Sequence, residues 1–160
     1  MTEIRVPTPY GFTLFCDDIR NEMDGKVTLV GIYTAEMIFN VPFPVIIPKL
    51  GFVVKYFERR DESSEPLNLQ IYFPGDPDDT PSVVSQIPHE QFRITPAQSD
   101  NENNDPLLFC IMNMVISPVN ILKEGRIKVR MIRGQDTIKI GSLKIKTTAV
   151  NFETDRSTAA

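Results

Sequence analysis

Apolar and polar residues along this chain alternate with a period of two, which is the repeat of a β-strand with one covered face. The alternation is cleanest over Leu67–Phe73, and it recurs over Leu50–Phe57. Two further segments, Val27–Tyr33 and Leu107–Ser117, are apolar at almost every position, as expected of strands covered on both sides. The strand is therefore the dominant predicted element.

The last two predicted strands, Arg126–Arg133 and Thr137–Thr147, flank the turn residues Gly134-Gln135-Asp136 and predict a hairpin. In the second strand the apolar residues change parity at Gly141-Ser142. A β-bulge shifts the phase of a strand by one residue, and glycine tolerates the backbone that it needs. We therefore expect a bulge at this point.

Seven to nine short strands separated by turn signals, with almost no helical pattern, predict an all-β, antiparallel β-sandwich of the Ig-like or C2-like type. A strand-rich barrel is the alternative. The length of 160 residues favours one domain. We place this domain at residues 1–150 and expect a flexible C-terminal tail at residues 151–160, where the apolar pattern has ended.

The apolar runs are too short for a membrane-spanning helix. The first residues lack the apolar core of a signal peptide, which predicts a cytoplasmic location. In that compartment the two cysteines, Cys16 and Cys110, are expected to be buried reduced thiols rather than a disulfide.

The formal net charge of −4 gives no electrostatic reason to expect nucleic-acid binding. The charges are unevenly distributed, however. Residues 61–105 contain ten Asp or Glu and one Arg, whereas residues 106–148 contain eight Lys or Arg and two acids. This asymmetry predicts either opposed faces that meet in an oligomer or a partner, or solvated loops beside a solvated strand face.

Within the basic half, Arg126, Lys128 and Arg130 alternate with apolar residues and so share one face of a strand. Three like charges on a strand face can bind an acidic partner. They can also protect an exposed strand from aggregation. These three residues are the candidate interaction residues.

Carboxylates are the other group of interest. A calcium ion takes six to eight oxygen ligands, often from two loops at one end of a sandwich. The alternative is that these acids solvate turns and accept hydrogen bonds from backbone amides. The candidate metal ligands are Asp17, Asp18, Asp76, Asp78 and Asp79.

The sequence predicts no catalytic residue and no cofactor. His89 is the one histidine, and both cysteines lie inside predicted strands, which disfavours a nucleophilic Cys–His pair. Zinc-ligand spacings and glycine-rich phosphate loops are absent from the sequence. A hydrolase with two carboxylates would need a cleft that the pattern does not predict.

The stretch FCDDIRNEMDGK, residues 15–26, combines acids and cations behind a cysteine. We interpret Asp18–Lys26 as a connection between the first two strands that includes one helical turn. Asp17 or Asp18 would be its N-cap, and Ile19 and Met23 would together close the end of the core.

The motif C-D-D-I-R-x-E-x-x-G-K-x-T-L-x-G-x-Y over Cys16–Tyr33, followed by F-x-x-P-F-P-x-x-x-P-K-L over residues 39–50, resembles the N-terminal signature of a bacterial and phage domain family of unknown function. The resemblance implies a small intracellular protein of phage or mobile-element origin with an accessory role. It implies no activity, cofactor or catalytic residue.

The leading hypothesis is a non-enzymatic interaction or accessory domain that binds a protein partner or self-associates. The alternative is a calcium- or ligand-binding sandwich module that uses the acidic loops. A carboxylate-dependent hydrolase comes third.

Overall fold

The computed structural model describes residues 8–59, 65–94 and 107–149, and the regular structure in them is β-strand with two short 3₁₀ turns. The turns are η1 (Met23–Gly25) and η2 (His89–Gln91). The strands are β1 (Tyr10–Asn21), β2 (Val27–Tyr33), β3 (Glu36–Phe39), β4 (Val45–Ile47), β5 (Leu50–Arg59), β6 (Leu67–Tyr72), β7 (Val83–Ile87), β8 (Arg93–Ile94), β9 (Leu107–Ile116), β10 (Val119–Ile121), β11 (Gly125–Arg133) and β12 (Asp136–Thr147).

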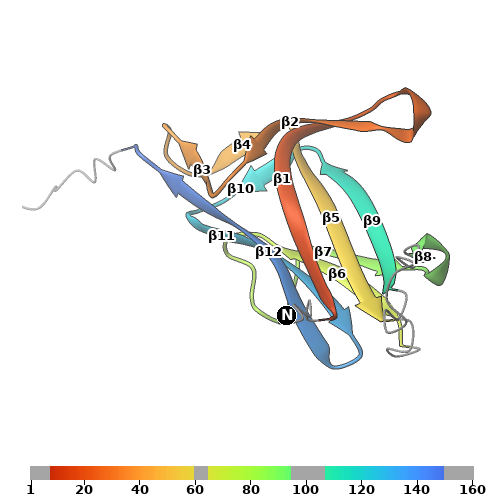
Figure 1. The fold of residues 1–160 in the computed structure, drawn as a ribbon. Helices are drawn as coiled ribbons and strands as arrows, with labels where there is room; N and C mark the ends of the chain where they lie inside the picture. The colour runs from red at the N-terminus through yellow and green to blue at the C-terminus, as the bar shows by residue number, and fades with distance from the viewer. Residues whose placement is uncertain (1–7, 60–64, 95–106, 150–160) are drawn as a thin grey trace, which may run out of the picture.

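These strands form two five-stranded sheets and one small ladder. The first sheet has the order β2-β1-β5-β9-β8, the second has the order β3-β12-β11-β6-β7, and β10 pairs with β4. The pairings in the described residues are antiparallel apart from β12 with β3, which is parallel. Figure 1 shows β1, β5 and β9 side by side. The predicted all-β, antiparallel sandwich is confirmed, with more strands than the seven to nine expected because several edge segments are short separate strands.

The core lies between the two sheets and is built from alternate residues of their long strands. Leu67, Leu69 and Ile71 of β6 are buried, as their spacing predicts. They pack with the inward residues of β11, the neighbouring strand of the same sheet, and with those of β5 in the opposite sheet. The members of this core on the two strands are Leu50, Phe52, Val54 and Tyr56 of β5, and Ile127, Val129 and Met131 of β11.

The predicted C-terminal hairpin and its bulge are both present. β11 pairs with β12 down to Arg133 opposite Asp136, and Gly134 in the turn has a φ of 58°. The register shifts between Val129 and Arg130, because Val129 lies opposite Gly141 whereas Arg130 lies opposite Lys139. This bulge restores the inward direction of the apolar residues in the second half of β12.

Glycine is required at the bulge because the sheets touch there. A Cβ atom on Gly141 would lie 2.7 Å from the Cβ of Thr13, which belongs to β1 in the first sheet. Such a contact is too short to be tolerated without movement of one strand.

The interpretation of residues 18–26 as the connection between the first two strands is wrong in its bounds: residues 18–21 belong to β1, the one helical turn is η1, and neither Asp17 nor Asp18 is its N-cap. β1 continues to Asn21, which lies opposite Val27, so the first two strands form a ladder well beyond the last β1–β5 pair at Cys16. The chain reverses at η1, where Asp24 has a φ of 63°. Met23 is 85% exposed and closes no core. The two strands continue as an arm, visible in Figure 1, because their mutual ladder satisfies the backbone groups that a cap would otherwise serve.

Cys16 and Cys110 are both buried and free of disulfides, as expected. Within the described ranges, no helix is long and apolar enough to cross a membrane. The predicted tail at residues 151–160 lies outside the described residues.

Candidate binding site on the second sheet

An open pocket of about 610 Å³ lies on the outer face of the second sheet, over β11 and β12. Four of the eight residues that line it are cationic, although the formal net charge of the chain is −4. The residues that line it are Asp78, Arg126, Lys128, Val129, Arg130, Lys139, Gly141 and Ser142.

The strand pattern explains why the cations share one side. Ile127, Val129 and Met131 point into the core, so Arg126, Lys128 and Arg130 alternate with them and point outward. On β12 the bulge separates the outward residues Lys139 and Ser142 by three positions instead of two. We attribute the hollow to this wider spacing, since Ile140 and Gly141 between them face the first sheet.

The predicted interaction residues are therefore brought together, with one addition that the sequence reasoning missed. Lys139 lies opposite Arg130 in the β11–β12 register and lines the same pocket. The signal that pointed to it was already available in the predicted hairpin, because the cross-strand partner of an outward residue also points outward.

Asp78 reaches this pocket from the loop between β6 and β7. Its Oδ1 atom is 3.1 Å from Lys128 Nζ and 3.4 Å from Arg130 Nη2. The side chain of Asp78 remains 81% exposed. One of the predicted calcium ligands therefore contacts two of the predicted interaction residues.

The cations differ in how firmly they are held. Arg130 lies over the ring of Tyr72, with the guanidinium carbon 4.5 Å from the ring centroid, and its side chain is only 17% exposed. Arg126 donates a hydrogen bond of 3.2 Å to Ser142 Oγ. Among the described residues, Lys139 has no carboxylate partner within ion-pair distance. Among the described residues, Arg126 and Lys139 are thus less neutralised than Lys128 and Arg130, which contact Asp78.

The whole outer face of β11 and β12 carries more positive than negative charge. Two carboxylates of the described residues reach its cations: Asp78, and Glu36 of β3, which pairs with Lys144 and Lys146. We call the six cations the basic face: Arg126, Lys128, Arg130, Lys139, Lys144 and Lys146.

The electrostatics follow from these contacts. The hydrogen bond from Lys128 and the charges of Lys128 and Arg130 hold the pKa of Asp78 below its usual range. Lys146 and Lys144 lower the pKa of Glu36 in the same way. Both carboxylates are therefore ionised at neutral pH and partly neutralise the basic face.

The candidate calcium ligands do not lie in one group. Asp17 and Asp18 are neighbours on β1, whereas Asp76, Asp78 and Asp79 lie in the β6–β7 loop. In the part of the chain that the structure describes, no group of three or more His, Cys, Asp or Glu residues is placed to hold a metal ion. Calcium binding stays a prediction that a calorimetric titration tests.

Each of the other four aspartates has a contact of its own. Asp17 accepts a hydrogen bond from the Tyr33 hydroxyl. Asp79 Oδ1 accepts one of 3.1 Å from Thr80 Oγ1. Asp18 contacts Lys49 Nζ at 2.7 Å, and this contact holds its pKa below the usual range. Asp76, described below, fixes its own loop.

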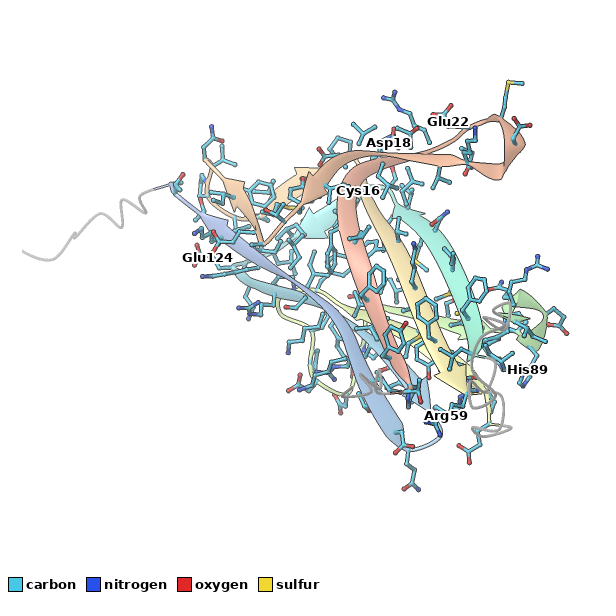
Figure 2. All side chains as sticks on the ribbon, viewed as in Figure 1. Cys16, Asp18, Glu22, Arg59, His89 and Glu124 are labelled. Atoms are coloured by element: carbon cyan, nitrogen blue, oxygen red, sulfur yellow. The ribbon has the colours of Figure 1, made fainter. Side chains whose placement is uncertain are left out.

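Cys16 and His89 do not form a nucleophilic pair. Figure 2 shows Cys16 at the base of the β1–β2 arm, whereas His89 lies near the other end of the first sheet. Burial is the main cause that raises the pKa of the Cys16 thiol. A protonated, buried thiol is a poor nucleophile.

The fold and the site define a class: an all-β domain of two packed sheets, one of which exposes a cationic outer face. A family model, described as a family of unknown function (DUF6941), matches residues 11–148. The chain therefore belongs to the DUF6941 family. Comparison with curated proteins gives no match. The expected resemblance to a family of unknown function is confirmed in that form, while the bacterial or phage origin stays a prediction.

Proposed function

We propose that this protein is a non-enzymatic interaction domain that binds an acidic segment of a partner protein through the basic face. The observation that carries this proposal is the pocket of about 610 Å³, with four cations and one carboxylate in its lining. Cations gathered around an open pocket favour encounter with an anionic partner and fix its orientation. Self-association, the other form of partner binding predicted from the sequence, is tested by sedimentation.

A protein partner fits this face better than a nucleic acid does. The overall charge of −4 disfavours the approach of a long polyanion, whereas a short acidic segment can contact the basic face alone. The carboxylate of Asp78 within the pocket also supports carboxylates as the ligand chemistry.

The test is a fluorescence anisotropy titration with a labelled oligoglutamate peptide at low salt. We expect binding that weakens as salt rises. The double variant Arg126→Gln/Lys139→Gln should bind roughly three- to thirtyfold more weakly, because each exposed charge contact is worth up to about 1 kcal/mol.

The matched control is Lys26→Gln/Arg93→Gln, which removes two exposed cations elsewhere and changes the net charge equally. It should bind nearly as wild type does. Equal losses in both double variants would contradict a specific site. Preferential binding of a single-stranded oligonucleotide in a parallel titration would replace the protein partner with a nucleic acid.

A further inference from the structure

The β6–β7 loop holds its shape without using the carboxylate of Asp78. Asp76 is the residue that fixes this loop: its Oδ2 atom accepts hydrogen bonds from Phe73 N at 2.8 Å, Ser82 N at 3.1 Å and Ser82 Oγ at 2.7 Å. Backbone bonds from Asp76 N to Phe73 O and from Thr80 N to Pro77 O complete the two turns. Asp78 is thereby free to serve another purpose.

What Asp78 does instead is place a carboxylate among the cations of β11. The loop carries it to Lys128 and Arg130, which follow it by about fifty positions in the sequence. Arg130 Nη1 also lies 3.4 Å from the backbone carbonyl of Asp78. The carboxylate of Asp78 is mostly exposed, so water can replace its contacts with Lys128 and Arg130 at a small cost in free energy.

The occupied and open parts of the pocket are adjacent. On β11, Lys128 lies between Arg126 and Arg130, and Lys139 lies opposite Arg130 on β12, so Arg126 and Lys139 lie at opposite ends of this group of cations. A peptide with successive carboxylates that contacts both Arg126 and Lys139 therefore passes over Lys128 and Arg130 and brings a carboxylate to them. That position is already taken by Asp78.

We propose that Asp78 is a tethered competitor: its carboxylate occupies the Lys128–Arg130 part of the pocket, and a carboxylate of an acidic peptide displaces it on binding. This inference rests on the proposed function. It adds that the ligand group bound by Lys128 and Arg130 is a carboxylate, and that Asp78 limits the affinity for it. A group tethered to the same chain competes at a high effective concentration, so even a weak contact lowers the apparent affinity for an external ligand.

The test compares Asp78→Asn with Asp79→Asn in the oligoglutamate titration. Both variants remove one negative charge from the same loop. Asp79 contacts Thr80 and, in the described residues, no cation within ion-pair distance, so Asp79→Asn measures the general effect of charge. We expect Asp78→Asn to bind roughly two- to fivefold more tightly than Asp79→Asn, since release from the competitor adds to that general effect.

The outcomes separate the inference from the function on which it rests. The inference would be overturned, and the proposed function left intact, if Asp78→Asn and Asp79→Asn bound the peptide equally well while Arg126→Gln/Lys139→Gln still bound it more weakly than the wild type. Failure of the wild type and of every variant to bind the peptide would overturn both. Weaker binding by Asp78→Asn would also overturn the inference, because it would make Asp78 a ligand-binding residue.

Discussion

Two carboxylate–cation contacts on one strand, β11, have opposite surroundings. Arg130 points outward to Asp78, whereas Arg133, three residues further on, points inward to Glu58 of β5. The Arg133 and Glu58 side chains are 7% and 3% exposed, while that of Asp78 is 81% exposed. The same chemistry therefore joins the two sheets inside the molecule and only neutralises part of the basic face outside it.

The buried contact is part of a wider polar group. Tyr56 donates a hydrogen bond of 3.2 Å to Glu58 Oε2. Arg133 also donates to the backbone carbonyl of Glu65 and lies 5.9 Å from the centroid of the Phe92 ring. Removing one partner leaves a buried charge without compensation, which does not happen at the surface, where water replaces the lost partner.

The largest effect should follow from breaking the buried contact. We expect Arg133→Met to lower the free energy of unfolding by about 3–5 kcal/mol, because Glu58 would lose its cationic partner while staying buried. The matched variant Arg130→Met on the outward side should cost roughly 1 kcal/mol, mainly through the lost contact with Tyr72. Urea denaturation measures both.

The double variant Glu58→Leu/Arg133→Met checks the reason. If the loss arises from an unpaired charge, the second substitution should recover much of the stability. Similar losses for Arg133→Met and Arg130→Met would refute the contrast between the inner and outer contacts.

A smaller effect concerns the thiol that shares the buried environment. Burial, and secondarily the charge of Glu58, raises the pKa of Cys110 from 9.0 to about 11, with Arg133 acting in the opposite direction. A group with a raised pKa in the folded state stabilises the fold fully below its unfolded pKa. The stability should therefore decrease as pH rises from 9.0 to about 11.

The measurement is a series of urea denaturations over this pH range, with Cys110→Ala as the comparison. The variant should lose less stability over the range, since one titrating group has been removed. Parallel pH profiles for the two proteins would show that Cys110 ionises alike in the folded and unfolded chains.

Residues whose role depends on local pattern could be predicted from the sequence. The alternation over β6 and β11 gave the buried residues and the common side of Arg126, Lys128 and Arg130. The parity change on β12 gave the bulge next to Gly141. Both rest on the two-residue period of a strand, which neighbouring residues reveal by themselves.

Residues whose role depends on a distant strand could not be predicted in this way. Asp78 was grouped with Asp76 as a calcium candidate, because the sequence does not show that β6 pairs with β11 and brings its following loop over Lys128. The length of β1 was missed for a similar reason: Asp17 and Asp18 resemble a cap until the pairing of β1 with β2, in which Asp18 lies opposite Val30, is known.

The smallest effect on stability should come from the outer contact itself. Asp78→Asn is expected to leave the urea midpoint indistinguishable from that of Asp79→Asn, because Asp76 holds the loop and the Asp78 carboxylate is solvated whether or not it is paired. Lowering the pH should likewise change the free energy of unfolding little. The depressed pKa of Asp78 stabilises the fold at pH values above the unfolded pKa, and this contribution is lost only as pH falls through the folded pKa.

A clear drop in the midpoint of Asp78→Asn alone would mean that the contact fastens the loop to the sheet, as Glu58–Arg133 joins the sheets. An unchanged midpoint together with tighter peptide binding would show that β11 uses one kind of contact for folding on its inner side and for ligand competition on its outer side.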